Sequence, residues 1–300
     1  MVEQAQATVV TAPALRSRRP QGELVKTLRR LSKNHGAVAG AVVLTLIVLM
    51  AIFAPALAPY DPLDQDYVRV LAAPSGTNLL GTDQFGRDIL SRIIVGSRQS
   101  LQVAIIAIAI AGSIGTILGL ATGYYGGWID MVIQRLIDMQ LAFPGILFAL
   151  AVVAVLGPGL RNAMIAVGIS LVPAFARMVR GSVLSARENA YVEAARVIGA
   201  SDHRIVLRHI LPNVLAPIMV LATVAMAWAI LIGASLSFLG LGAQLPKPEW
   251  GLDLATSRDY LREAWWMSSF PGLAIMLTVV SVNLLGEGLR DALDPRLRSR

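Results

Sequence analysis

Residues 101–123 read LQVAIIAIAIAGSIGTILGLATG, a run of 23 residues without a charged side chain. About 20 consecutive apolar residues are enough for a helix to cross the hydrocarbon core of a bilayer. Six stretches qualify, the fourth with the help of its flanking residues: Ala37–Leu57, Leu101–Gly123, Met139–Leu156, Ala163–Ala176, Val214–Leu236 and Phe270–Leu285. The sequence therefore predicts an all-α integral membrane protein with six transmembrane helices.

Two of these stretches are interrupted by residues that disfavour an apolar helix. Pro173 lies in the fourth stretch and Asn283 in the sixth. Because proline removes a helical hydrogen bond, an alternative interpretation makes the fourth stretch a re-entrant segment that does not cross the bilayer. We expect six crossings, which would place both ends of the chain on the same side of the membrane.

The composition of the whole chain supports a membrane location. Of the 300 residues, 55% are hydrophobic and 15% are charged, whereas a soluble domain carries about 25% charged residues. This composition excludes a soluble globular protein and a disordered one. The chain has no cysteine and only three scattered histidines, so we expect no disulfide, no thiol catalysis and no metal site.

The net charge of +7 follows from the predicted topology. Cytoplasmic segments of membrane proteins carry an excess of lysine and arginine. With the N-terminus inside, 18 of the 26 basic residues fall in inside segments, which supports both termini in the cytoplasm. The basic charge therefore needs no nucleic-acid partner to explain it.

The predicted spans divide the chain into five parts. The first residues are polar and lack periodicity, which indicates disorder, and the next carry leucines at helical spacing, as in a helix lying on the inner membrane surface. The parts are a disordered cytoplasmic leader (1–22), an amphipathic cytoplasmic helix (23–36), a first span with an extracytoplasmic segment (37–96), the main transmembrane domain (97–287) and a cytoplasmic tail (288–300).

The spans contain no group that could drive transport or catalysis. Their cores hold no Asp, Glu, Lys, Arg or His, which weakens both an ion-coupled carrier and an intramembrane hydrolase. The three lysines, Lys26, Lys33 and Lys247, do not belong to a phosphate-binding loop. If the protein moves a solute against a gradient, the energy must come from a partner on the cytoplasmic side.

The longest inside loop after the leader covers residues 177–211. Its pattern predicts two short helices separated by Gly199, a residue that readily adopts a left-handed turn. Ser201 or Asp202 can cap the second helix, and Pro212 closes it. In the first helix four residues share one face by their spacing: Tyr191, Ala194, Ala195 and Ile198. One interpretation is an amphipathic loop that lies under the lipid headgroups.

The order of residues in this loop also resembles a known signature. Glu193-Ala194-Ala195, followed by Gly199 and then by Leu211-Pro212, resembles the EAA signature of ATP-binding-cassette (ABC) importer permeases, although His209 stands at a position that is apolar in that family. The resemblance implies a loop, at about 182–212, that docks into a cytoplasmic ATPase. The residues assigned to this coupling loop are Glu193, Ala194, Ala195, Gly199, Arg204, Arg208, Leu211 and Pro212.

Other segments are similar to the C-type subunit of the peptide and nickel permeases. These segments are Leu80–Asp83 with Gly86–Asp88, Leu236–Gly242, Trp250-Gly251 and Asn283–Arg296, where Glu287 replaces the aspartate that is common in the family. Together the similarity spans about 32–296 of the chain. The motif before the second span is extracytoplasmic, and we expect a structural role rather than substrate contact for Gly81, Thr82, Asp83, Gly86, Arg87 and Asp88.

Several single residues carry more specific expectations. Thr82 or Asp83 should cap the helix that enters the second span, with Arg87 and Arg92 on its polar face. The Leu236–Gly242 run should combine tight helix packing with a turn. An ion pair is expected between Asp138 and Arg135, and three tryptophans are expected to anchor the chain at the membrane interface: Trp250, Trp265 and Trp266.

The resemblance implies the assembly in which the chain works. It implies a type I ABC importer permease fold and a heterodimeric pore, in which a B-type permease subunit supplies the other half. Two cytoplasmic ABC ATPases would bind below, and an extracytoplasmic solute-binding protein would deliver the substrate. The chain itself would bind no cofactor, and the ATP and Mg would be used by the ATPases. The location would be the bacterial cytoplasmic (inner) membrane, as a multi-pass protein in the lipid bilayer.

The substrate class that the resemblance implies is a peptide, either a dipeptide or an oligopeptide. The same architecture importing a nickel chelate or a glutathione-like peptide remains an alternative. An autonomous ion-coupled secondary carrier and a membrane-embedded enzyme are alternatives from other classes. The chain is expected to have no catalytic residues of its own.

Overall fold

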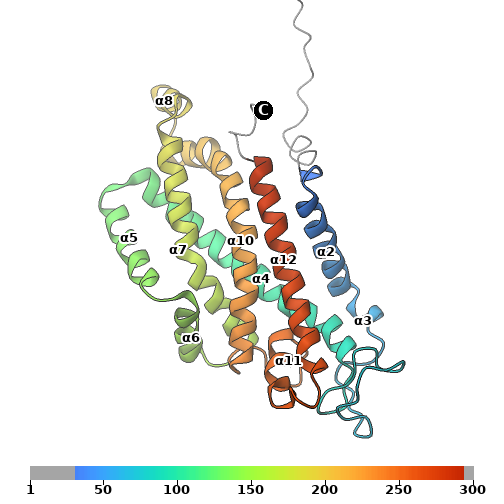
Figure 1. Ribbon diagram of the computed structural model, residues 1–300. Helices are drawn as coiled ribbons and strands as arrows, with labels where there is room; N and C mark the ends of the chain where they lie inside the picture. The colour runs from blue at the N-terminus through green and yellow to red at the C-terminus, as the bar shows by residue number, and fades with distance from the viewer. Residues whose placement is uncertain (1–30, 294–300) are drawn as a thin grey trace, which may run out of the picture.

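The computed structural model describes residues 31–293 of the chain (Figure 1). Every regular element in this part of the chain is a helix. The helices are α2 (His35–Ile52), α3 (Ala54–Leu57), α4 (Ile89–Tyr125), α5 (Gly127–Leu141), α6 (Gly145–Leu156), α7 (Leu160–Arg187), α8 (Ala190–Val197), α9 (Asp202–Arg204), η1 (Ile205–Ile210), α10 (Leu211–Phe238), α11 (Trp250–Ser257), η2 (Arg258–Tyr260) and α12 (Trp266–Leu293). The predicted leader 1–22, most of the segment 23–36 and residues 294–300 of the predicted tail lie outside the described residues.

Five of the predicted spans are long apolar helices. They are α2, α4, α7, the run Asp202–Phe238 that contains α10, and α12. α7 continues through Pro173 without a break, so the re-entrant alternative for the fourth span is wrong. The apolar runs of the sequence therefore located these spans, although the helices extend beyond them; α4 reaches 37 residues.

The third predicted span is not one straight helix. The stretch Met139–Leu156 is divided between α5 and α6, which meet at an angle of 95°. Pro144 stands at the bend, and it explains the break because proline disfavours a helical conformation in the residue before it. Counted as one broken crossing, the pair brings the total to six. The start of α2 and the end of α12 then lie at the same end of the bundle (Figure 1).

α4 is the central helix, and its packing on α7 depends on glycine. Gly115, Gly119 and Gly123 recur at every fourth position and face α7. A Cβ atom at Gly119 would lie 2.6 Å from the Cβ of Val179, and one at Gly123 would lie 2.7 Å from the Cβ of Val183. Small residues at this spacing let two membrane helices approach closely. The two helices therefore form a tightly packed pair.

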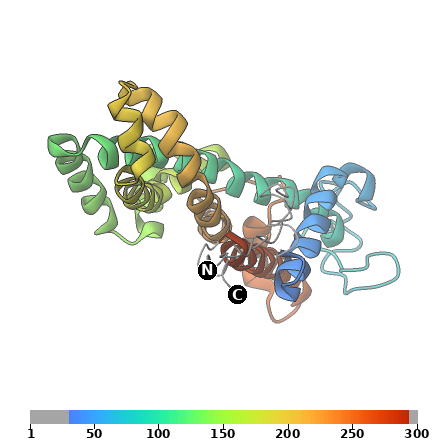
Figure 2. The same ribbon diagram turned by 90° about the horizontal axis from the view of Figure 1, so that it is seen from above.

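α2 lies at one end of an elongated bundle, and the bent pair α5–α6 lies at the other (Figure 2). α2 packs against α12, where a Cβ at Gly40 would meet the carbonyl oxygen of Ser281 at 2.6 Å. Arg98 of α4 donates to the carbonyl oxygens of Ala51 and Ile52 at the end of α2. This guanidinium satisfies carbonyls that the end of a helix leaves without a donor.

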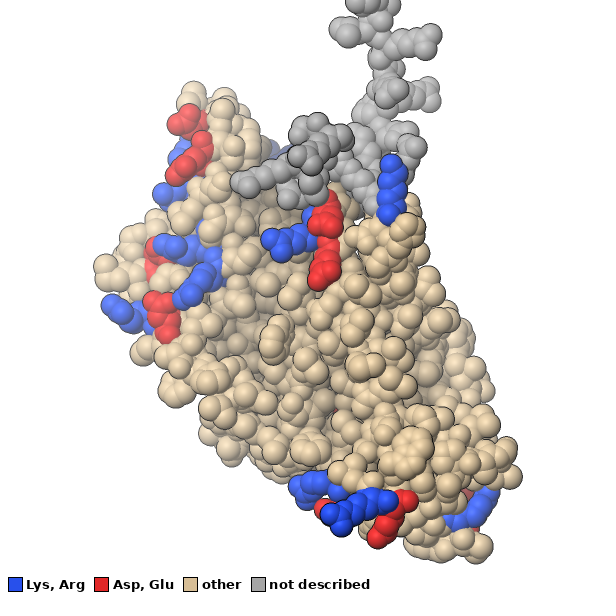
Figure 3. Space-filling model, in the orientation of Figure 1, with Lys and Arg blue, Asp and Glu red and all other residues tan. Residues whose placement is uncertain are grey.

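Charged side chains gather towards the two ends of the bundle (Figure 3). On the face shown, a band without charge separates the two groups and covers the middle of α10 and α12. Asp138 of α5 pairs with Arg177 of α7 at 2.6 Å, so the predicted pairing with Arg135 is wrong. The uncharged band is what the hydrocarbon region of a bilayer requires of a spanning protein.

Candidate functional site

The first candidate region comprises residues 188–212, which we call the cytoplasmic loop. α8 begins at Ala190, just after α7 ends at Arg187. α8 ends at Val197, and Gly199, two residues later, has a φ of +77°. The N–H of Gly199 donates to the carbonyl of Arg196 at 2.9 Å, and the N–H of Ala200 donates to that of Ala195 at 3.0 Å. This bond pair is the Schellman ending of a helix, and it confirms the predicted left-handed turn.

The second half of the cytoplasmic loop differs from the prediction. α9, the π-helical turn η1 and α10 follow one another without a gap, so Pro212 does not close a separate helix. The reason is that the wider turn of η1 precedes Pro212 and accommodates a ring that would collide with a regular α-helical turn. Ser201 holds the N-cap position but makes no side-chain capping bond. The loop is therefore a direct extension of α10.

The buried face of α8 is also different from the predicted one. Val192 and Ala195 are buried against Ile205 and Ile210. Tyr191, Ala194 and Ile198, which the spacing had placed with Ala195 on one face, are exposed. The face is set by Val192, because the hydrophobic partners come from η1, which follows the Gly199 turn.

The tip of the cytoplasmic loop is apolar and uncovered. Val197 is 87% exposed and Ile198 is 83% exposed. Of the residues assigned to the coupling loop, Ala195 is buried, Leu211 is half-buried, and six are exposed: Glu193, Ala194, Gly199, Arg204, Arg208 and Pro212. An exposed apolar tip on an ordered turn is typical of a surface that contacts another protein.

The cytoplasmic loop is attached to the end of α4 through Tyr124, which the sequence analysis did not identify. The Tyr124 hydroxyl donates to Asp202 Oδ1 at 2.6 Å, and the guanidinium of Arg196 lies 5.7 Å from the centre of its ring. Arg187 donates to the carbonyl oxygens of Gly123 and Tyr124 at 3.2 and 3.4 Å. These contacts tie both sides of the loop to one point of the central helix.

The second candidate region lies at the opposite end of the bundle, and we call it the extracytoplasmic cluster. It comprises residues 78–92 with Trp250, Asp253 and Trp266. Asp88 caps α4 by accepting from the N–H of Ser91 at 2.8 Å, so the predicted cap by Thr82 or Asp83 is wrong.

Asp83 has a different role in the cluster. It accepts from the backbone N–H of Phe85 at 2.8 Å and from that of Arg87 at 3.0 Å. It also accepts from Arg87 Nε at 2.6 Å, and both of these charged side chains are buried. Arg87 and Arg92 were expected on the polar face of α4; Arg87 precedes this helix, and both side chains are buried. Asp83 therefore closes a tight loop instead of starting a helix.

Two glycines of the extracytoplasmic cluster allow the backbone to pass close to other segments. Gly81 and Gly86 have φ values of +79° and +72°. A Cβ at Gly86 would lie 1.9 Å from the carbonyl oxygen of Asp66, and a Cβ at Gly81 would lie 2.7 Å from that of Ala72. Glycine is required at both positions for conformation and for space.

Trp250 and Trp266 are structural parts of this cluster rather than interface anchors. Both are buried. The indole N–H of Trp250 donates to the carbonyl of Ile93 at 3.0 Å, and that of Trp266 donates to the carbonyl of Thr82 at 3.2 Å. The prediction of an interface role is therefore wrong for these two, while Trp265 is exposed.

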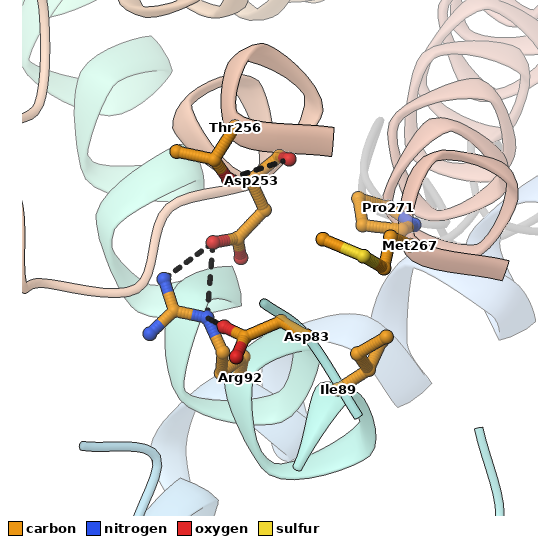
Figure 4. Close-up of a pocket in the computed structure, with 7 residues that line it drawn as sticks. All are labelled: Asp83, Ile89, Arg92, Asp253, Thr256, Met267 and Pro271. Atoms are coloured by element: carbon orange, nitrogen blue, oxygen red, sulfur yellow. Dashed lines mark hydrogen bonds and ion pairs between the residues drawn. The ribbon is translucent and has the colours of Figure 1, made fainter. Parts of the chain in front are cut away.

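A buried ion pair joins α4 to α11 inside the cluster. Arg92 donates to Asp253 through two nitrogens, and its Nε also lies 3.8 Å from Asp83 (Figure 4). Burial raises the pKa of the Asp253 carboxyl, and the positive charge of Arg92 opposes this shift. Burial also lowers the pKa of the Arg87 guanidinium. The Asp253 carboxylate therefore depends on Arg92 to remain ionised.

The cavity beside this ion pair is too small to hold a solute. Its volume is about 10 Å³, whereas ligand pockets have volumes of about 300–1,000 Å³. The lining residues are Asp83, Ile89, Arg92, Asp253, Thr256, Met267 and Pro271 (Figure 4). Among the described residues 31–293, no three His, Asp or Glu side chains are grouped so that they could hold a metal ion. The buried ion pairs and hydrogen bonds of the cluster therefore contribute rigidity.

Two families of known proteins match this chain. Residues 115–299 match the family described as binding-protein-dependent transport system inner membrane component. Residues 24–74 match the N-terminal TM domain of oligopeptide transport permease C. The first match covers more than half of the chain and includes the whole cytoplasmic loop.

Individual proteins are also similar to this chain over most of its length. A dipeptide transport system permease protein, DppC, from Alkalihalophilus pseudofirmus is 50% identical over 274 residues, which are 91% of this chain and 90% of that protein. A glutathione transport system permease protein, GsiD, from Pectobacterium atrosepticum is 46% identical over 294 residues, 98% of each chain.

A solved structure shares the fold. It is the MetNI methionine ABC transporter in inward-facing conformations, with a TM-score of 0.56 and 18% sequence identity. The similarity covers 68% of this chain and 97% of that chain. At this identity the likeness concerns the arrangement of the helices, and it confirms the predicted importer permease fold.

Proposed function

The chain belongs to the family of binding-protein-dependent transport system inner membrane components, and from this premise we propose that it forms one half of a heterodimeric pore that imports peptides. It is a multi-pass membrane subunit of a bacterial ABC importer, and ATP hydrolysis belongs to a separate partner subunit. A solute-binding protein is the other partner that this family uses. An autonomous carrier and a membrane enzyme do not fit this family.

The exposed tip of the cytoplasmic loop is the observation that supports coupling to an ATPase. Val197 and Ile198 stand at the end of α8. α8 lies at the same end of the bundle as the start of α2 and the end of α12 (Figure 1), which the distribution of basic residues places in the cytoplasm. Burial of apolar surface is the main favourable contribution to most protein–protein association. We therefore assign this tip, with Glu193 and Arg204 beside it, to the contact with a cytoplasmic ATPase.

A force applied to the cytoplasmic loop has two rigid paths into the bundle. α8 follows α7 after two residues, and η1 continues directly into α10. Both of these long helices pack on α4 or on each other. In the proposed cycle, ATP draws the two ATPases together, the loop follows, and α7 and α10 tilt so that the pathway opens to the outside. Hydrolysis then returns the inward-open state.

A B-type permease subunit is proposed as the other half of the pore. The bent pair α5–α6, at one end of the bundle, leaves large apolar side chains uncovered: Trp128, Met131, Leu136, Phe143 and Val155. The match of residues 24–74 to the N-terminal domain of permease C supports the assignment as the C-type half.

The proposed substrate class is a peptide. The dipeptide permease relative, at 50% identity over most of both chains, supports a dipeptide or oligopeptide. A glutathione-like peptide is a second candidate, because the glutathione permease relative is similar over 98% of each chain. The extracytoplasmic cluster has no cavity of a size that would select among peptides. We therefore assign most of the selection to the binding protein.

The proposal can be tested with the complete complex in liposomes. The chain, a B-type subunit, the ATPases and the binding protein are reconstituted, and uptake of a labelled dipeptide or of glutathione is measured. We expect uptake that requires ATP and the binding protein, and loss of most uptake in Val197→Ser. The matched control is Val68→Ser, because Val68 is also almost fully exposed, at 94%, and lies between α3 and α4, outside the cytoplasmic loop and the α5–α6 surface. Uptake driven by an ion gradient without ATP would contradict the proposal.

A further inference from the structure

Pro173 leaves one carbonyl of α7 without its helical donor. It lies inside α7 and is buried. In an α-helix the carbonyl of residue 169 would accept from the N–H of residue 173, and proline has no N–H. A carbonyl in the hydrocarbon region cannot turn to water, so it must find another donor within the protein.

Gln140 of α5 supplies that donor. Its Nε2 donates to the carbonyl oxygen of Ile169 at 2.8 Å. Gln140 is the second-last residue of α5, immediately before the bend at Pro144. A side chain of one helix therefore completes the backbone hydrogen bonding of another helix, at the position where proline had interrupted it.

Two ion pairs continue the same contact towards the cytoplasm. Arg177 Nη2 lies 2.6 Å from Asp138 Oδ1. Arg180 binds Asp130 through two bonds of 2.6 Å. The pairs are Asp130 with Arg180, Asp138 with Arg177 and Gln140 with Ile169. Residue numbers therefore rise along α5 while those of the partners on α7 fall. The three contacts form an antiparallel polar ladder between α5 and α7.

This ladder joins α7 to a helix that buries little of its own surface. Ile137 is the one buried residue in α5. Gly126 and Gly127, which precede and begin α5, have φ values of +66° and +59°, and a Cβ at either would meet open space. α6, in contrast, packs its buried Ala149 and Val153 into the main apolar core. Without the ladder, α5 could turn about its glycine end independently of α7.

We propose that Gln140 is a positioning residue that makes α5 move as one body with α7 during transport. α7 leads into the cytoplasmic loop, so a movement of the loop reaches the uncovered side of α5 through this contact. The inference rests on the proposed function, because it requires that an ATPase displaces the loop. Its chemical basis is specific: the amide of Gln140 is needed because Pro173 removed a donor.

Three variants distinguish a positioning role of Gln140 from a role that only satisfies the carbonyl of Ile169. Gln140→Leu removes the donor. Pro173→Ala returns the N–H to α7, so the double variant Gln140→Leu/Pro173→Ala has a satisfied Ile169 carbonyl but lacks the Gln140 bond between the two helices. The matched control is Gln134→Leu on the same helix, since Gln134 Nε2 makes no hydrogen bond within the described residues. Thermal unfolding in detergent and peptide uptake per ATP hydrolysed are measured on the complete complex.

A positioning role predicts that stability and coupling respond differently. Gln140→Leu should lower the unfolding temperature and reduce uptake per ATP about fivefold, within the range that residues on a coupling route produce. The double variant should regain stability but keep the low uptake per ATP. Recovery of both in the double variant would overturn the inference, since Gln140 would then only satisfy a carbonyl. Normal uptake per ATP in Gln140→Leu would overturn it as well.

A distance measurement that needs no substrate tests this inference independently of the peptide substrate. Spin labels are placed on Val132 of α5 and Ser185 of α7, both exposed, in a chain that has no native cysteine. Their separation should be the same in the nucleotide-free and ATP-bound complex, and it should change with ATP in the double variant. An ATP-dependent change in the otherwise unaltered chain would overturn the inference. Absence of peptide uptake with a constant separation would reject the peptide proposal alone.

Discussion

The two ends of the bundle use their side chains in opposite ways. In the extracytoplasmic cluster, charged and aromatic residues are buried, and Arg92, Asp253 and Trp266 each have a hydrogen-bond partner inside the chain. In the cytoplasmic loop, apolar residues at the tip have no cover, and Val197 is almost fully exposed. The first arrangement fixes the ends of α4, α11 and α12 relative to one another. The second leaves a surface free for a partner.

Glycine shows the same contrast within a single residue type. Gly86 and Gly199 both have positive φ. Around Gly86 the chain is crowded by the backbone of Asp66, whereas no atom lies within 4 Å of a Cβ placed at Gly199. Substitution should therefore damage folding at the first position and damage function at the second.

The largest effect is expected for Gly86→Ala. The added Cβ would overlap the carbonyl oxygen of Asp66, so the loop must move and the buried ion pairs must open. We expect a loss of about 4 kcal/mol or more, in the class of severe substitutions. The measurement is the amount of folded protein in membranes and its unfolding temperature in detergent. Gly76→Ala is the control, because a Cβ there meets nothing within 4 Å; equal behaviour of the two variants would contradict the account.

A somewhat smaller effect is expected for Arg92→Ala. It leaves the buried carboxylate of Asp253 without its cation, and loss of one partner of a buried pair costs about 3–5 kcal/mol. Arg258→Ala is the control, because the pair of Arg258 with Asp259 is exposed at 3.4 Å and should contribute less than about 1 kcal/mol. The measurement compares the unfolding temperatures of the two variants with that of the unaltered protein. A similar small loss in both would mean that the extracytoplasmic cluster is not the rigid end.

The smallest effect on stability is expected for Gly199→Val. The left-handed conformation costs a branched residue about 1–3 kcal/mol, and there is space for the side chain. The protein should therefore remain in the membrane, but the turn should change and uptake per ATP should fall. Gly199→Asn is the control, since asparagine tolerates this conformation, and it should keep most of the uptake. Full uptake in Gly199→Val would show that the turn is not needed for coupling.

The sequence predicted those parts of the fold that depend on local pattern. The length of the apolar runs located the spans, and Gly199 predicted the end of α8. Both signals lie within the segment that they describe. The prediction of the buried face of α8 was wrong because Val192 packs on Ile205 and Ile210, which follow the Gly199 turn. Local spacing alone cannot identify such a partner.

The roles of single polar and aromatic residues were the least predictable from the sequence. Trp250 donates to the carbonyl of Ile93, which is 157 positions away, so its burial could not be read from its neighbours. Asp138 pairs with Arg177 across two helices instead of with the nearby Arg135. Pro144 could have indicated the bend before α6, but the apolar run around it favoured one continuous span.

Cross-linking at the tip of the cytoplasmic loop tests the central claim most directly. Because the chain has no native cysteine, Val197→Cys and Val155→Cys each create one thiol, and the two valines are equally exposed at 87%. Each variant is co-expressed with its ATPase and treated in membranes with a short reagent that joins the introduced thiol to a lysine amine of the partner. We expect a product containing the ATPase for Val197→Cys and none for Val155→Cys. A product from both positions, or from neither, would contradict the assignment of the loop as the ATPase contact.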